Sequence, residues 1–427
     1  MPAIVHTYQR YIGALNYALF MLLMFLLPFP WHFVQPVTVI WLIAWVLEGR
    51  WLQRSNFRLS KGLIPMLLLV LFVGWEALSL LWSLNPKQGA QDLTMHLPVL
   101  AMALIGLFGV NDNYKAINIK QALIIGCLVA VACYLMTIYW YYSIGHLRRD
   151  TQYFWWSCLG DGLIGKIKHR FYLAMCLMLS LAFSVDVFKH YRDKYNPVAA
   201  ALTIAVVDMI LVASIILTGS RIMMLLLPIM AILLFFQHYK GKYKRIFAVA
   251  VIIASVLFVG WCMRYQTRFV LTIERLKTNY EVGQSINNRH IEPRIYIWHK
   301  VLDNAKQYGI CGLGMGSATD LLVAEYEKDG ITDYAAKRWG THNQYLNTWM
   351  DLGPLAVLLM VLILFSSVYC HTGQARRDAT VVCLLFGVGL MLETALLRMS
   401  GLYIFYAFLT LLLLEQRAEE QVPLVRR

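Results

Sequence analysis

Long apolar blocks dominate the chain and restrict the folds open to it. Most blocks run for about 18 residues or more, which is the length of an α-helix that crosses the hydrocarbon core of a bilayer. Of the 427 residues, 59% are hydrophobic and 15% are charged, whereas a soluble protein carries roughly 25% charged residues. The mean hydropathy is +0.58. The sequence therefore predicts an all-α polytopic membrane protein.

About twelve transmembrane helices can be placed on these blocks. The first block has no small-residue cleavage site after it, so we expect a retained span instead of a signal peptide. The fourth block is short, and no repeat of the length of a solenoid unit is apparent. The expected spans are residues 12–28, 31–49, 63–83, 97–110, 120–144, 171–187, 198–219, 222–238, 246–263, 353–370, 379–396 and 400–415.

Lys and Arg residues mark one side of the membrane. With the N-terminus inside, the short inner segments and Arg10 together hold 19 of the 38 Lys and Arg residues. Cytoplasmic loops carry such an excess. Short outer loops such as residues 83–96 carry almost none. Both termini are therefore expected in the cytoplasm.

Two outer segments, residues 145–170 and 264–352, break this charge pattern. The first includes Lys168 and Arg170, and the second is the longest polar stretch, with eleven Lys and Arg residues. Long translocated segments escape the charge rule, so the topology stands. The net charge of +14 thus gathers in cytoplasmic loops and on the outer face. This distribution disfavours nucleic-acid binding and indicates an anionic substrate outside.

Three parts follow from these positions. We expect spans one to nine in residues 1–263, a lid outside the membrane in 264–352, and spans ten to twelve with a cytoplasmic tail in 353–427. The lid is too long for a plain connection. Pro293 suits the first turn of a helix over 293–307, a Gly-rich turn follows at 311–320, and a second helix is expected over 321–330. The stretch 337–353 is expected to continue into span ten as a helix.

Four short motifs on the outer face carry residues suited to chemistry. Arg221 ends "TGSR" between spans seven and eight, where a snorkelling helix-end arginine is the alternative. Arg294 and Trp298 of "RIYIW" share a helix face, as they would on an ordinary amphipathic helix. "GLGMG" follows no strand, so it does not indicate a nucleotide site. His342 of "HNQYL" suits proton transfer, with a structural hydrogen bond as the alternative; in a helix it would share a face with Tyr345.

The eight cysteines show no CxxC or Cys/His spacing. Most lie within apolar blocks, where a small buried apolar side chain is the simpler interpretation. The outer face also lacks a DxD motif or an acidic cluster. We expect no disulfide framework, no metal site and no cofactor.

The order of these motifs resembles the O-antigen ligase/polymerase superfamily. "TGSR" after a span, then "RxxxW", "GLGMG", "HNQYL" and "DLG" opening the next span match it, and "HRFYLA" at residues 169–174 is similar to its His-x-x-Tyr motif. The number of spans and the large loop match over nearly the whole chain. The chain departs from the family in reading "QYGICGLG" where Asn-Pro often precedes the Gly-rich turn. The resemblance implies a GT-C-like glycosyltransferase.

The resemblance implies roles for particular residues. Arg221 and Arg294 would bind and stabilise a departing pyrophosphate, because guanidinium forks match phosphate oxygens, and His342 would activate the acceptor hydroxyl, giving inversion without a metal. The residues implied in catalysis are Arg221, Arg294 and His342, and the candidates for substrate binding are Arg221, Arg294, His169, Tyr172, Trp298, Asn343 and Tyr345. Arg289, a further candidate for substrate binding, lies nearby without a clear family counterpart, and the choice of Arg294 over it rests on the spacing to Trp298.

The resemblance further implies a bacterial inner-membrane enzyme with its active site facing the periplasm. Its donor would be an undecaprenyl-pyrophosphate-linked glycan and its acceptor lipid A-core, with membrane lipids as the remaining partners. The compact loop favours an O-antigen ligase; a polymerase of the same superfamily is the alternative.

Glu76, Asp208 and Glu393 within the expected spans suit a proton-coupled transporter, but we expect interhelical hydrogen bonds for them, since no basic partner lies in the spans.

Overall fold

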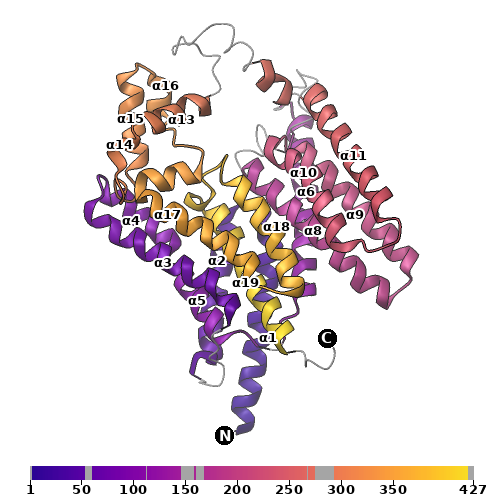
Figure 1. Cartoon of the computed structure of the whole chain (residues 1–427). Coiled ribbons are helices and arrows are strands. Elements are labelled where there is room, and N and C mark those ends of the chain that lie inside the picture. Colours follow the sequence, from indigo (N-terminus) through magenta and orange to yellow (C-terminus); the bar gives the residue numbers. More distant parts are fainter. Residues whose placement is uncertain are drawn as a thin grey trace. The chain divides into compact units, whose positions relative to one another are not determined.

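A computed structural model describes residues 2–52, 60–111, 113–145, 158–159, 168–266, 268–274 and 293–421. Within these ranges the chain is helical and contains no strand (Figure 1). A helix satisfies its own backbone hydrogen bonds, which is the requirement the bilayer interior imposes. The predicted all-α polytopic membrane fold is confirmed.

Eleven helical segments among the described residues are long and apolar enough to cross a membrane. The twelfth expected span, residues 379–396, corresponds to α18 (Gly373–Gly389), which begins earlier and has only 17 residues. The eleven segments are Tyr8–Leu26, Trp31–Leu52, Lys61–Trp82, Pro86–Phe108, Ala116–Ser143, Arg170–Lys194, Pro197–Leu217, Arg221–His238, Lys244–Tyr265, Gln344–Tyr369 and Met399–Arg417.

The chain divides into two compact units, and each is described by itself. Unit 1 comprises Met1–Arg58, Phe108–Val270 and Glu420–Arg427. Its central helix is α8, most of whose apolar part is buried, because α8 packs against α6, α9 and α10. The helices of unit 1 are α1 (Pro2–Leu26), α2 (Trp31–Glu48), α6 (Ala116–Ser143), α8 (Arg170–Lys194), α9 (Pro197–Leu217), α10 (Arg221–His238) and α11 (Lys244–Tyr265).

Unit 2 comprises Leu59–Leu107 and Leu271–Glu419. Its long helices are joined by a group of four shorter ones, α13 to α16, which form a small apolar core with Tyr326 and Ile297 fully buried and Met350 contributed by α17. The helices of unit 2 are α3 (Ile64–Ser79), α4 (Pro86–His96), α5 (Pro98–Phe108), α13 (Pro293–Asp303), α14 (Ala305–Tyr308), α15 (Ala318–Lys328), α16 (Thr332–Ala336), α17 (Gln344–Tyr369), α18 and α19 (Met399–Gln421).

The outer loop expected at residues 83–96 is instead a helix, α4. The Asn85 side chain caps it by accepting from the Gln88 backbone N–H at 3.1 Å, and Pro86 occupies the first turn. Asn at the N-cap and Pro at the first helical position are strong helix-start signals. The fourth span is therefore α4 continued by α5, longer than the expected 97–110.

Two local predictions in the lid also need correction. The helix expected over 293–307 is interrupted at Asn304, which separates α13 from α14. Residues 337–343 are not helical: Arg338 and His342 have positive φ angles of 47° and 48°. Helix α17 starts only at Gln344, because the Asn343 side chain caps it by accepting from the Leu346 N–H at 3.1 Å.

The Gly-rich turn is present as predicted and holds the lid against the long helices of unit 2. Gly312, Gly314 and Gly316 all have positive φ angles, which glycine adopts without strain. A Cβ at Gly314 would lie 2.3 Å from the Ser83 Cα. The Gly314 N–H donates to the Asp351 carbonyl at 2.8 Å. The glycines therefore serve a close backbone approach.

Candidate functional site

The predicted site residues fall in both units. Unit 2 holds Arg294 and His342, with the side chains that support them, whereas unit 1 holds Arg221. Arg289 lies outside the described residues. The geometry is accordingly built within each unit, beginning with His342.

His342 sits in a turn that α13 and α17 hold from both sides. The Trp298 Nε1–H of α13 donates to the Thr341 carbonyl at 3.0 Å. The Thr341 hydroxyl donates to the Asn343 carbonyl at 2.9 Å. Between them His342 adopts the left-handed region, which costs a non-glycine residue about 1–2 kcal/mol. The surrounding hydrogen bonds hold the imidazole in this strained position.

The expected sharing of one helix face by His342 and Tyr345 is wrong, because His342 precedes the helix. Tyr345 instead points its hydroxyl to the Gly387 carbonyl of α18, at 2.9 Å. The side-chain oxygen of Asn343 caps α17 by accepting from the Leu346 N–H. Trp298, Asn343 and Tyr345 thus have polar groups engaged within the protein. Contact of these three with substrate stays a prediction.

Two arginines bear on His342. The pKa of His342 is lowered to about 4. Burial is the main cause, and the positive charges of Arg294 and Arg398 add to it. The imidazole is therefore neutral at neutral pH, with a lone pair free for a proton. The indole of Trp339 presents its edge to the imidazole ring, with ring centroids 6.1 Å apart. A neutral base beside guanidiniums can take a proton while the guanidiniums hold an anion.

Arg398 and Glu393 were not predicted at the site. Both lie in the connection between α18 and α19, and the guanidiniums of Arg294 and Arg398 both act on the Glu393 carboxyl, although burial raises its pKa overall. Arg398 is exposed and has no ion pair within the described residues. The signal for Arg398 was its place in the short outer connection between two spans, as for Arg221. Glu393 was misplaced inside a span because α18 ends at Gly389, seven residues before the end of the expected span 379–396.

Asp351 organises the Gly-rich turn beneath this site. Its Oδ1 accepts from the backbone N–H groups of Ser317 and Ala318 at 2.9 and 2.7 Å, and its Oδ2 accepts from Asn347 at 2.8 Å. The carboxylate therefore joins the start of α15 to the first turns of α17. In the sequence, Asp351 stands out only as the first residue of the "DLG" motif, which does not reveal this contribution.

In unit 1, the predicted residues lie at one end of a helical bundle. Arg221 is the first residue of α10, and His169 and Tyr172 lie at the start of α8, their rings 5.6 Å apart. The chain reverses between α8 and α9 and again between α9 and α10, so the starts of α8 and α10 share an end.

Lys168, which was expected to add positive charge for a substrate, is instead buried. Its ammonium group donates to the carbonyls of Leu27 and Phe29 at 2.9 and 2.8 Å. Burial lowers the pKa of Lys168 to about 8. Lys168 therefore stabilises the end of α1 instead of facing a ligand.

Helices suited to cross a membrane, and a neutral histidine beside arginines outside the spans, define a multi-pass membrane protein with a candidate site for an anionic substrate. A model of the O-antigen ligase family matches residues 204–361. This match supports the resemblance to the O-antigen ligase/polymerase superfamily that the motif order predicted. A protein of this family would be a glycosyltransferase-like enzyme that acts on a lipid-linked glycan. No curated protein matches the chain.

The matched range divides the site residues. It contains Arg221, Arg294, the Gly-rich turn and His342, together with most of the residues that hold the His342 turn. His169, Glu393 and Arg398 lie outside it. The family match therefore supports the motif order, whereas Glu393 and Arg398 rest on the geometry of unit 2.

Proposed function

We propose that this protein is an O-antigen ligase of the bacterial inner membrane. It transfers a glycan from undecaprenyl pyrophosphate to lipid A-core on the periplasmic face, with both termini in the cytoplasm, and so completes lipopolysaccharide. The observation that carries the proposal is the neutral His342 held beside Arg294 and Arg398 in unit 2. The family match over residues 204–361 supports the substrate class.

The chemistry is a single displacement at the anomeric carbon. An acceptor hydroxyl oxygen attacks that carbon, the bond to the pyrophosphate oxygen breaks, and the bonding electrons leave with the pyrophosphate. His342 takes the hydroxyl proton. Attack opposite the leaving group inverts the anomeric configuration. Arg294 stabilises the charge that develops on the pyrophosphate, so the step requires no metal ion.

Arg398 and Arg221 extend this assignment in different ways. Arg398 acts on the same imidazole as Arg294, so we assign it to the anionic donor as well. Arg221, in unit 1, is assigned to the donor from its "TGSR" motif and from the family match that includes it. Arg289, within the matched residues, and His169 and Tyr172 of the "HRFYLA" motif, which lie outside them, remain candidate substrate-binding residues.

Single substitutions test the assignment. Arg221→Gln, Arg294→Gln and His342→Ala are expected to reach the membrane at normal levels and to lose glycan transfer. His299→Ala, an exposed histidine on α13, is the matched control and keeps transfer. Near-normal transfer in all three site variants would rule out the assignment.

A lipopolysaccharide gel separates the ligase from the alternative, an O-antigen or exopolysaccharide polymerase, which the family match supports equally. In a strain lacking the protein, a ligase leaves polymerised glycan on its lipid carrier and core without glycan. A polymerase leaves core that bears a single repeat. The glycan is probed on both carriers in the same strain.

A proton-coupled transporter is the alternative of a different class. It predicts substrate flux across sealed vesicles, whereas a transferase predicts product on the outer leaflet alone. Of the three acids within the expected spans, Glu76 has its carboxyl 2.5 Å from His96 Nδ1. This contact is the expected interhelical hydrogen bond, although the expected absence of a basic partner within the spans was wrong.

A further inference from the structure

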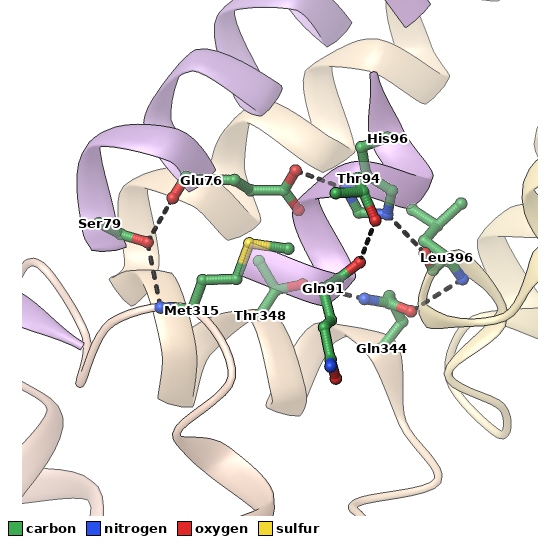
Figure 2. Close-up of polar contacts among 9 residues, drawn as sticks. All are labelled: Glu76, Ser79, Gln91, Thr94, His96, Met315, Gln344, Thr348 and Leu396. Atoms are coloured by element: carbon green, nitrogen blue, oxygen red, sulfur yellow. Dashed lines mark hydrogen bonds and ion pairs between the residues drawn. The ribbon is translucent and has the colours of Figure 1, made fainter. Parts of the chain in front are cut away.

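The connection between α18 and α19 is held to α17 and α4 by hydrogen bonds to its backbone. The Gln344 N–H donates to the Leu390 carbonyl at 2.8 Å, and the Leu396 N–H donates to the Gln344 side-chain oxygen at 3.0 Å. The Leu396 carbonyl lies 2.7 Å from His96 Nε2. Figure 2 shows the side chains of Gln344 and His96 meeting Leu396 from two sides.

The hydrogen bonds of His96 fix where its protons lie. A carbonyl can only accept, so Nε2 carries a proton and donates it to Leu396. The other ring nitrogen, Nδ1, shares a proton with the Glu76 carboxyl at 2.5 Å. With either placement of that shared proton the pair carries no net charge, which suits its full burial. Glu76 therefore holds the imidazole in the tautomer and orientation that bind Leu396.

The same end of α3 also holds the Gly-rich turn. The Ser79 hydroxyl donates to the Glu76 carbonyl at 2.7 Å, and the Met315 N–H donates to the Ser79 oxygen at 3.1 Å (Figure 2). One short region of α3 is thus joined to the turn beneath the site and, through His96, to the connection that carries Arg398.

From these contacts we infer that His96 and Gln344 are positioning residues, which bind both backbone polar groups of Leu396 and thereby place Arg398 and Glu393 beside His342. This inference rests on the proposed function. Arg398 follows Leu396 by two residues, so a shift of the Leu396 peptide moves the guanidinium. Gln344 follows His342 by two residues, so its hydrogen bond with the Leu396 N–H links the segment that carries His342 to the connection that carries Arg398.

The charged groups that face His342 come from two elements. Arg294 belongs to α13 and Arg398 to the connection, while Glu393 lies within the field of both guanidiniums. Release of Leu396 withdraws one positive charge from the imidazole. A positioning role therefore has a measurable electrostatic consequence, which a general loss of stability would not produce.

Gln344→Met tests the first contact, since methionine has a similar length but cannot accept the Leu396 N–H. Transfer by the full chain in membranes, with lipid-linked glycan as donor, is expected to fall by about 10-fold to 100-fold. The loss is expected in kcat, with the acid limb of the pH profile displaced to higher pH. Thr348→Val is the matched control: it removes only the 3.4 Å contact of the Gln344 amide and keeps both rate and profile.

His96→Gln and His96→Ala test the second contact. A glutamine amide nitrogen reaches nearly as far as Nε2 and can still donate to the Leu396 carbonyl, whereas alanine cannot. His96→Ala is expected to lower kcat in the same way as Gln344→Met, and His96→Gln to restore at least half of the logarithmic loss. Equal losses in the two variants, at equal membrane levels, would overturn the role of His96.

A double-mutant cycle with Arg398→Gln decides whether the contacts act through Arg398. Once Arg398 is gone, Gln344→Met is expected to have an effect of less than about twofold, because coupled residues are not additive. Independent, additive losses would overturn the inference. The proposed function is judged separately by Arg294→Gln and His342→Ala: if these abolish transfer while the cycle is additive, only the positioning role fails.

Discussion

The indole N–H of Trp298 donates to the carbonyl of Thr341, 3.0 Å away, and the next residue is His342. This hydrogen bond joins the "RIYIW" motif to the "HNQYL" motif across 43 residues. Trp298, whose spacing from Arg294 singles out that arginine in the sequence, therefore also fixes the position of His342. One helix, α13, supplies both the guanidinium and the anchor of the imidazole.

Trp298→Phe keeps the aromatic ring and removes the anchor. A buried carbonyl that loses its donor costs about 1–3 kcal/mol, and the strained turn at His342 is expected to relax. We expect transfer to fall by at least about tenfold, with the protein still present in the membrane.

Trp349→Phe is the matched control for this prediction. Trp349 packs against the same apolar core as Trp298, its ring lies 5.7 Å from that of Tyr308, and its indole N–H has no hydrogen bond among the described residues. It is expected to retain most activity. Equal losses in Trp298→Phe and Trp349→Phe would show that ring size, and not the hydrogen bond, supports the site.

Gly314→Ala is expected to disrupt the contact between the Gly-rich turn and α3 and to lower the unfolding temperature, whereas Gly330→Ala is expected to be tolerated. Both glycines have positive φ angles, of 89° and 74°, so both substitutions cost about 1–2 kcal/mol in backbone strain. Only at Gly314 would the new Cβ meet backbone, at 2.3 Å, while nothing lies within 4 Å at Gly330. Thermal unfolding in detergent measures the difference, and similar midpoints for the two variants would contradict it.

The sequence predicted the spans better than the turns between them, for a physical reason. Helices in a membrane are set by apolar length, which is local and readable. The turn at His342 depends on the N-cap at Asn343 and on Trp298, a contact between residues 43 apart. A helical continuation through 337–343 was therefore a natural but wrong extrapolation.

Candidate site residues were predictable only where a motif marked them. Arg294 and His342 stand in short motifs, and the structure places both near Arg398. Glu393 and Arg398 lie in the α18–α19 connection, which gains its place through backbone hydrogen bonds from Gln344 and His96. No spacing in the sequence encodes such contacts, which join positions as far apart as His96 and Leu396.

Acid pH is expected to destabilise the protein through His342. Its folded-state pKa of about 4 lies below the unfolded value of about 6.5, so the folded state binds this proton more weakly. The stability cost is absent above pH 6.5 and grows as pH falls through 6.5 towards 4, reaching about 2 kcal/mol at pH 5.

His342→Gln removes that titration. Relative to the parent protein, its melting temperature is expected to fall less between pH 8 and pH 5. Arg398→Gln is expected to change the pH dependence in the same direction, since removal of a neighbouring positive charge raises the pKa of His342. An unchanged difference between the two pH values in His342→Gln would contradict the low pKa.

Donor binding is expected to raise the pKa of His342. Two guanidiniums help to hold that pKa at about 4, where the imidazole is neutral but a weak base. A bound pyrophosphate offsets their charge, favours the imidazolium, and so strengthens the base only when the donor is in place. NMR titration of histidine-labelled protein with and without undecaprenyl pyrophosphate measures the shift, with undecaprenol as the control that lacks the anion. A His342 pKa that stays near 4 when the pyrophosphate binds would contradict the assignment of these arginines to the donor and of His342 as the base.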